Sequence, residues 1–225
     1  MIFLLSLLVG LTGVFAAARA SCTDQILDSA SLRLERQNLR VPRYTVTRHY
    51  TVTNAHLKAP AIIRVLWSYV PGQGKQFKIL EERGTSGLTR RSIVSVLEEE
   101  AASSRQTLDP SAITSGHYLV KQQTDNGSEY KLSLVPREKT KYLLNGTVSL
   151  QRADCAITGV DGVTAKRISF WVSEAHVIQE FAKYGEFWLP SKTRSIASVR
   201  FVGRTELLIE AEAYQFEDAQ PVVTQ

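Results

Sequence analysis

The chain has 225 residues, of which 44% are hydrophobic and 22% charged, and its formal net charge is +5. This ordinary globular balance excludes intrinsic disorder, collagen-like repeats and a protein with several membrane spans. Two cysteines exclude a disulfide-rich scaffold and a zinc site built from cysteines. The mild positive charge is not concentrated in one segment, so we expect no nucleic-acid partner.

The first twenty residues have the pattern of a signal peptide. Residues 2–15 are apolar or small and uncharged, which is the length of a signal-peptide core and short for a membrane-spanning helix. Ala18-Arg19-Ala20 resembles an A-x-A cleavage site. We therefore expect cleavage near Ala20 and an exported, periplasmic protein. Because no Lys or Arg precedes the apolar run, an uncleaved leader that anchors the chain in the membrane is the alternative.

Cys22 directly follows the predicted cleavage region, where a bacterial lipoprotein carries its lipidated cysteine. A lipobox has a Leu-like residue three positions before the cysteine, whereas this chain has Arg19. Membrane attachment through a lipidated Cys22 is therefore the less favoured alternative. In an oxidising compartment Cys22 and Cys155 could form a disulfide that links the N-terminal segment to the sheet, or they could remain two separate thiols.

The next part of the chain is predicted to be one helix followed by strands. Apolar residues recur at helical spacing over 23–39, and Pro42 ends this helix. The period then changes to two, which is typical of half-buried strands. Strands are predicted at 44–52, 61–70 and 76–80, the last two joined by a turn at Pro71–Gly74.

Helical segments interrupt the strands in the middle of the chain. Residues 92–103 carry an apolar stripe that predicts a helix, and Asp109-Pro110 is typical of the start of another short helix. The three consecutive acids Glu98–Glu100 could suggest acid–base chemistry. Since consecutive residues of a helix point in different directions, we expect them to form a solvated face instead.

The second half is predicted to consist almost entirely of strands, starting at Tyr118. Asn145-Gly146 is either a hairpin turn or a bulge inside one long strand, and Asp161-Gly162 is predicted to be a turn. About ten strands joined by tight turns indicate an antiparallel meander, which at this length curls or closes. The predicted fold is therefore mainly β, within α+β: a curved antiparallel sheet or incomplete β-barrel over residues 21–214, covered by the two helical regions, with a flexible tail at 215–225. The further strands are predicted at 130–134, 142–151, 154–160, 174–184, 187–201 and 205–214.

The sequence offers no constellation for catalysis, metal binding or a cofactor. The four histidines, at positions 49, 56, 117 and 176, are not at metal-ligand spacing from one another or from a cysteine. A nucleophile elbow, a P-loop and a dinucleotide-binding glycine motif are all absent from the sequence. We therefore expect a protein that is not an enzyme and uses no cofactor.

Large aromatic and aliphatic side chains instead gather on single faces of the predicted strands. They could form an ordinary core under the helices, or line a cavity that the helices leave open for an acyl chain. The candidate cavity residues are Tyr44, Tyr50, Ile63, Val65, Trp67, Tyr69, Phe77, Tyr130, Leu132, Leu134 and Trp188.

The C-terminal half resembles a known bacterial family. The run Tyr130-Lys131-Leu132-Ser133-Leu134-Val135-Pro136, the stretch Asp154-Cys155-Ala156-Ile157 and the run Phe187-Trp188-Leu189-Pro190 carry the resemblance, together with 142–150 and 207–214. In these segments and in the order of its elements, the chain is similar to LolA/LolB-type outer-membrane lipoprotein-sorting proteins.

This resemblance implies a periplasmic carrier that binds acyl chains of lipids or lipoproteins in an apolar cavity and moves them towards the outer membrane. Burial of an acyl chain supplies about 0.8 kcal/mol per CH₂, so such binding needs no catalytic group. The implied partners are acyl chains, envelope proteins and, transiently, the membrane surface. The alternative is an envelope sensor of the RseB/MucB type, which uses the same fold for protein–protein contact.

Overall fold

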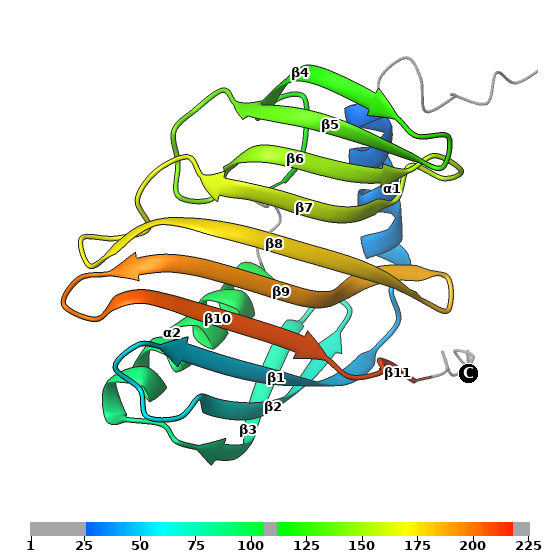
Figure 1. Cartoon of the computed structure of the whole chain (residues 1–225). Coiled ribbons are helices and arrows are strands. Elements are labelled where there is room, and N and C mark those ends of the chain that lie inside the picture. The colour runs from blue at the N-terminus through cyan, green and yellow to red at the C-terminus, as the bar shows by residue number, and fades with distance from the viewer. Residues whose placement is uncertain (1–25, 106–111, 218–225) are drawn as a thin grey trace, which may run out of the picture.

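The computed structural model describes residues 26–105 and 112–217. The predicted signal peptide, Cys22 and the short helix expected at Asp109 lie outside these ranges. The described part is one antiparallel sheet with two helices on one side of it (Figure 1). The elements are α1 (Ile26–Arg40), β1 (Tyr44–Asn54), β2 (Ala61–Val70), β3 (Gly74–Arg83), α2 (Gly87–Ser103), β4 (Tyr118–Asp125), β5 (Glu129–Pro136), β6 (Leu144–Gln151), β7 (Ile157–Thr164), β8 (Val172–Tyr184), β9 (Phe187–Val199), β10 (Gly203–Ala211) and β11 (Gln215–Phe216).

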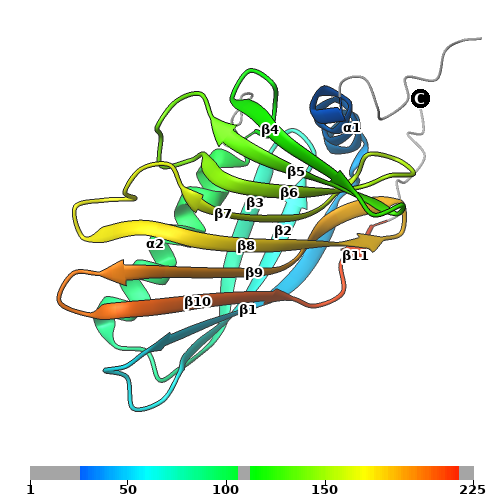
Figure 2. The ribbon, with the colours of Figure 1, turned by 45° about the horizontal axis from the view of Figure 1, so that its top comes forward.

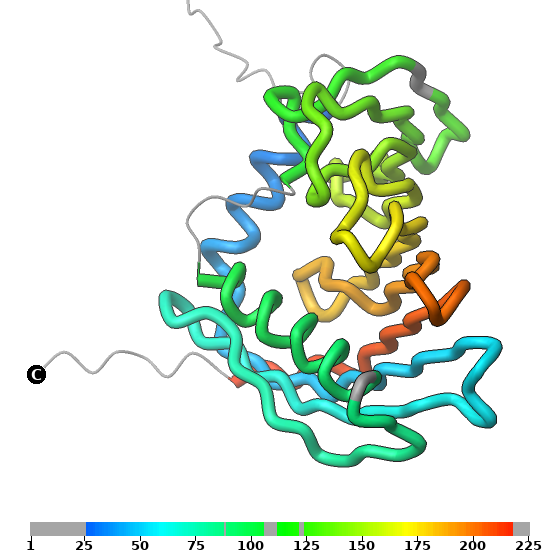
Figure 3. The backbone as a smooth tube through the Cα atoms, turned by 90° about the vertical axis from the view of Figure 1, so that its left-hand side faces the viewer, coloured from blue at the N-terminus to red at the C-terminus, as the bar shows by residue number. Residues whose placement is uncertain are grey.

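The strand order places the first long strand, β1, beside the last long strand, β10, in the interior of the sheet. It runs β3-β2-β1-β10-β9-β8-β7-β6-β5-β4, and β11 pairs with β1 beyond the end of β10. Strands β3 and β4 therefore form the two edges. Figures 2 and 3 show the sheet curving around the side that carries α1 and α2. The predicted fold class is confirmed: ten strands form the main path of a curved, open antiparallel sheet with two helices.

Two apolar cores fill the two flanks of the concave side. Beneath α2, the alternating pattern of β1 and β2 buries one face of each strand, as the period of two predicts. Ile93, Leu97 and Ala101 of α2 pack on this face and form the α2-side core. The α1-side core joins Ile26, Leu27 and Ala30 to the inner faces of β4–β7. Each helix thus covers one flank of the sheet.

Local side-chain contacts set the ends of the helices. Helix α2 begins at Gly87, five residues earlier than the sequence pattern predicts, because the Ser86 hydroxyl accepts a hydrogen bond from the Thr89 N–H at 3.2 Å. Helix α1 ends at Arg40, two residues before Pro42. Among the described residues, no helix is long and apolar enough to span a membrane.

The turn predicted at Asp161-Gly162 is wrong, because both residues lie inside β7. Asn145-Gly146 likewise lies inside β6, where Gly146 pairs with Gly162. A Cβ atom on Gly146 would overlap the carbonyl oxygen of Asp161. These glycines therefore serve the close approach of two strands, and neither has the positive φ that a tight turn requires.

The first residues of the segment predicted to be a flexible tail take part in the sheet. Gln215 and Phe216 form β11, in which Phe216 pairs with Tyr44 and packs on the α2-side core. The Glu217 N–H donates to the Arg43 carbonyl at 2.9 Å. Residues 218–225 lie outside the described part of the chain.

Candidate functional site

The inner face of the sheet is covered on its flanks but not at its centre. In β1 and β2 every second residue is buried, whereas the middle parts of β8, β9 and β10 have half-buried residues on the same face. We call this part of the sheet the central inner surface. It consists of Val177, Gln179, Thr193, Ser195, Leu207 and Ile209.

The strand register places these residues on the concave side. Directly paired residues in an antiparallel sheet point to the same face. One row runs from the buried Tyr50 through Ile209, Thr193 and Gln179 to the buried Val160. Because both ends of the row lie in the flanking cores, the three residues between them face the same inner side.

Side-chain size explains why the residues of the central inner surface are only half-buried. The parallel row across the sheet contains Gly146, Gly162, Val177, Ser195 and Leu207 in succession. Glycine, serine and valine fill much less space than the tyrosine, tryptophan and leucine side chains of the two flanks. The central inner surface is therefore set back between two bulkier cores, and its side chains are apolar with a few hydroxyl and amide groups.

A cavity of about 100 Å³ adjoins this surface between β4–β8 and the segment before β4. It is small beside the 300–1,000 Å³ of typical ligand pockets, so it would hold only a short alkyl segment. Gln179 belongs both to its wall and to the central inner surface, so the cavity borders this surface. The cavity is lined by Ile113, Tyr118, Leu134, Tyr142, Leu144, Gly146, Thr147, Val160 and Gln179.

A network of charges fixes α2 on its flank. The Arg48 guanidinium and the Lys75 ammonium each donate to Glu100 Oε1 at 2.8 Å. Burial alone would raise the pKa of Glu100, but the charges of Lys75 and Arg48 outweigh it and lower this pKa to about 2. The expectation that all three consecutive acids are solvated is thus wrong for Glu100, because its position on α2 faces β1 and β3.

Aromatic hydroxyl groups extend this network. Trp67 Nε1 donates to the Tyr50 hydroxyl at 2.9 Å, and the Tyr214 hydroxyl donates to the Pro190 carbonyl at 2.8 Å. Burial raises the pKa of Tyr50 to about 12, so this hydroxyl stays protonated at physiological pH. The charged groups of this network have partners within the protein, and their hydrogen bonds hold α2 against β1 and β3.

A shallow depression of about 360 Å³ lies on the opposite, outer face of β8–β10. Its charged residues are already paired with one another: Arg194 forms two hydrogen bonds to Glu206 at 2.7 and 2.8 Å, and Lys192 lies 3.1 Å from Glu210. Four of its six lining residues are charged, the other two being Ile178 and Leu208, whereas the cavity on the inner face is lined by uncharged residues. The inner face is therefore the better candidate site.

The structure places most of the predicted cavity residues in the two packed cores. Seven lie in or against the α2-side core: Tyr44, Tyr50, Ile63, Val65, Trp67, Tyr69 and Phe77. Tyr130, Leu132 and Leu134 lie in the α1-side core, and of the predicted set Leu134 also lines the cavity. Trp188 is half-buried on β9, where its backbone N–H and carbonyl both bond to the Gln37 side chain at 2.9 Å.

The residues of the central inner surface were missed in the sequence because they are small or polar. The signal that could have found them is the run of short side chains at alternate positions of two long strands, at 193, 195 and 197 and at 175 and 177. A search for large apolar residues finds the side chains that fill the interior of a half-barrel. The part of the inner face that they leave unfilled is identified by the positions that carry small or polar residues instead.

Other candidate chemistry is accounted for within the described residues. No group of His, Cys, Asp and Glu there could hold a metal ion. His49 pairs with Glu212 and His176 with Asp161, each at 2.7 Å. Cys155 is disulfide-bonded, and its predicted partner Cys22 lies outside the described residues.

Comparison with known proteins gives matches among solved structures. A LolA superfamily protein from Nitrosomonas europaea is 10% identical, with 89% of this chain and 96% of that chain covered and a TM-score of 0.42. A putative outer-membrane lipoprotein-sorting protein domain from Vibrio parahaemolyticus is 11% identical, with 87% and 95% covered and a TM-score of 0.41. A DUF1329 family protein from Desulfovibrio piger is 10% identical, with 88% and 95% covered and a TM-score of 0.40.

The first two of these structures bear the family names that the sequence resemblance indicates. No family model matches the chain, and no curated protein matches it.

Proposed function

We propose that the protein is an exported carrier of hydrophobic ligands, which holds an acyl chain against the central inner surface with one end in the adjoining cavity. The observation that carries this proposal is the half-buried stretch of small, polar and apolar side chains on β8–β10 between the two packed cores. No reaction is needed for this function. The driving force is the removal of the acyl chain from water.

The dimensions and chemistry of the surface suit such a ligand. Together with the adjoining glycines of β6 and β7, it crosses five strands from β6 to β10, a span of roughly 19 Å at the usual strand spacing. Ten methylene groups removed from water would contribute about 8 kcal/mol before the cost of ordering the ligand. Thr193, Ser195 and Gln179 offer hydroxyl and amide groups that could hydrogen-bond the ester or carboxyl end of the chain.

The cavity lies near the start of β6, and the positively charged side chain of Lys141 is located there. The Lys141 ammonium sits 4.8 Å from the ring centroid of Tyr142, which lines the cavity and is 43% exposed. The same ammonium donates to Glu99 Oε1 at 3.3 Å, so an anionic head group would compete with this exposed carboxylate. A ligand with an acyl chain and an anionic head group could place the chain in the cavity and the head group beside Lys141. Lipids and lipoprotein acyl chains are the substrate class that this arrangement favours.

Export to the periplasm is part of the proposal. Disulfides persist in oxidising compartments, and Cys155 is disulfide-bonded. Cys22 is the other cysteine of the chain, so we propose it as the partner. The intact mass of the purified protein tests these points together. We expect cleavage near Ala20, no lipid on Cys22, and a mass lower than that of the reduced chain by two hydrogen atoms.

The ligand site is tested by a pair of tryptophan substitutions on neighbouring residues of β8. Val177→Trp places an indole on the central inner surface, whereas Ile178→Trp places one on the outer face of the same strand. With a dansyl-labelled fatty acid as probe, Val177→Trp should weaken binding at least tenfold and Ile178→Trp should leave it unchanged. Equal binding by all three proteins, or no binding of the probe by the wild-type protein, would refute the proposed site.

A further inference from the structure

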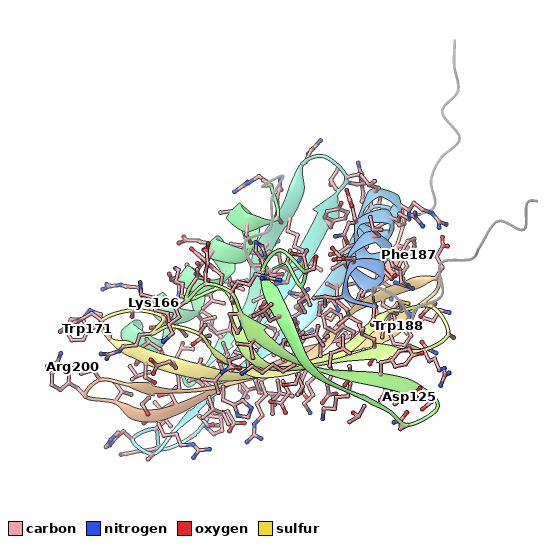
Figure 4. All side chains as sticks on the ribbon, turned by 90° about the horizontal axis from the view of Figure 1, so that it is seen from above. Asp125, Lys166, Trp171, Phe187, Trp188 and Arg200 are labelled. Carbon is pink, nitrogen blue, oxygen red and sulfur yellow. The ribbon has the colours of Figure 1, made fainter. Side chains whose placement is uncertain are left out.

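Three large aromatic side chains are exposed together at one end of the sheet. They come from the β7–β8 loop and the β9–β10 turn, and Phe170, Trp171 and Phe201 are 65%, 56% and 83% exposed. We call these three residues with Arg200 the aromatic tip. Figure 4 shows Trp171 and Arg200 at the same end of the molecule as Lys166, far from Phe187 and Trp188.

Contacts within the aromatic tip give it a defined structure. The Arg200 N–H donates to the Trp171 carbonyl at 2.8 Å, which joins the two loops. The Arg200 guanidinium lies 4.7 Å from the ring centroid of Phe170 and 5.3 Å from that of Phe201. The rings of Phe170 and Trp171 are 5.1 Å apart, and those of Trp171 and Phe201 are 6.1 Å apart. The aromatic side chains are thus held in place while their surfaces stay in water.

The backbone at Phe201 adopts a strained, left-handed conformation. Its φ is +66°, in the left-handed region that bulky residues rarely adopt and that glycine occupies without cost. Residues kept in such a conformation are concentrated at functional sites. Glycine would adopt this φ at position 201 without strain, so the backbone conformation alone does not explain the presence of phenylalanine.

The end of the sheet that carries the aromatic tip is strongly basic. Antiparallel order places the connections 55–60, 84–86, 137–143, 165–171 and 200–202 at this end, and they contain seven Lys or Arg residues and one acid, Glu138. The connections at the opposite end, 41–43, 71–73, 126–128, 152–156, 185–186 and 212–214, contain two Lys or Arg residues and three acids. Lys166, Arg167 and Arg200, all exposed, are part of the aromatic tip or precede it closely in the chain.

We infer that the aromatic tip is a docking site for the surface of an anionic phospholipid bilayer. Tryptophan and phenylalanine rings partition into the interfacial region of a membrane, and Lys and Arg side chains beside them are attracted by anionic head groups. Because the end of the sheet that carries the aromatic tip is the more basic one, attraction by anionic head groups orients the molecule with this end towards the membrane. The inference deepens the proposed function, because Tyr142 and Lys141 place the cavity towards the same end.

The experiment measures sedimentation of the purified protein with two kinds of vesicles. One is phosphatidylcholine alone, and the other contains an equal part of phosphatidylglycerol. We expect binding to the anionic vesicles, little binding to the neutral ones, and a decrease as salt is added. Trp171→Ser combined with Phe201→Ser should weaken binding at least tenfold. Leu39→Ser, which removes an apolar side chain that is 82% exposed on α1, is the matched control and should bind like the wild type.

Three further variants separate the effects of charge and of folding from the contribution of the aromatic side chains. Lys166→Gln should weaken binding to anionic vesicles about fivefold, whereas Lys183→Gln, near the opposite end of β8, should not. Phe201→Gly suits the positive φ, so it should keep the stability of the fold while vesicle binding falls.

Equal binding to both kinds of vesicle, no binding to either, or wild-type binding by the double serine variant would overturn the inference. Binding of the soluble dansyl probe by the same variants tests the ligand site separately. A protein that binds the probe but not the vesicles would refute the membrane contact and leave the carrier function standing, and the converse result would refute the carrier function alone.

Discussion

Removal of the Glu100 carboxylate is expected to destabilise the protein strongly at neutral pH. Glu100→Gln keeps the size of the side chain but leaves Arg48, whose side chain is only 7% exposed, without its anionic partner. Breaking a buried ion pair from one side costs about 3–5 kcal/mol, because the remaining charge stays desolvated. We expect the free energy of unfolding at pH 7 to fall by about that amount.

The pH dependence provides an independent estimate of the same interaction. Since the pKa of Glu100 is lowered from 4.5 to about 2, the charged form stabilises the folded state by roughly 3 kcal/mol, at 1.36 kcal/mol per unit. Because the folded-state pKa is the lower one, this stabilisation is fully present above pH 4.5 and is lost as the pH falls towards 2. About 2 kcal/mol should disappear between pH 5 and pH 3, and the Glu100→Gln variant should lack this loss.

Urea unfolding at pH 7, 5 and 3, followed by tryptophan fluorescence, measures both effects, because Trp67 is buried in the same core. Glu98→Gln changes an exposed carboxylate on the same helix and should have little effect at pH 7. A loss below about 1 kcal/mol for Glu100→Gln would show that the network does not hold α2 in place. A difference between wild type and variant that is the same at pH 7 and pH 3 would refute the assigned pKa.

Two other structural contacts lead to measurable losses of stability. Gln37→Ala removes two hydrogen bonds to the backbone of Trp188 that attach α1 to β9, and it should lower the free energy of unfolding in urea by about 2–3 kcal/mol. Arg36→Ala changes the exposed neighbouring position and is the control; equal losses for the two variants would contradict this role of Gln37. Gly146→Ala should destabilise the fold by about 1–3 kcal/mol, because its Cβ would overlap the Asp161 carbonyl oxygen. Gly127→Asn, in an open turn with positive φ, should be tolerated. Thermal melting compares the two variants, and an unchanged melting temperature for Gly146→Ala would show that β6 and β7 can separate at this position.

The local patterns of the sequence predicted the fold well because each strand has one face against a core. Alternation in 44–52 and 61–70 identified β1 and β2, and helical spacing identified α1. The prediction was wrong at Asp161-Gly162, since composition does not distinguish a glycine that permits a turn from one that permits two strands to approach. The half-buried, ion-paired position of Glu100 depends on Arg48 and Lys75, which are far from it in the sequence and reach it only through packing.

The candidate site was harder to predict than the fold, for a physical reason. A core is marked by the side chains that fill it, so Trp67 and Tyr50 stand out in the sequence and are indeed packed against α2. A binding surface in a half-barrel is marked by side chains too small to fill the space, such as Ser195 and Gly162, and these acquire meaning only when the register aligns them in one row.

The arrangement of the two cores gives the proposed carrier a means of changing its capacity. Among the described elements, α1 packs with β4–β7 and α2 packs with β1–β3, so the two helices belong to different cores. Strands β8–β10 join the two flanks, and the Gln37 side chain of α1 bonds to the backbone of Trp188 on β9. A change in the twist of these strands would widen or narrow the space over Val177 and Gln179 without breaking either core. Because the cavity of about 100 Å³ is smaller than an acyl chain, the proposed carrier function requires the space over Val177 and Gln179 to widen when a ligand enters.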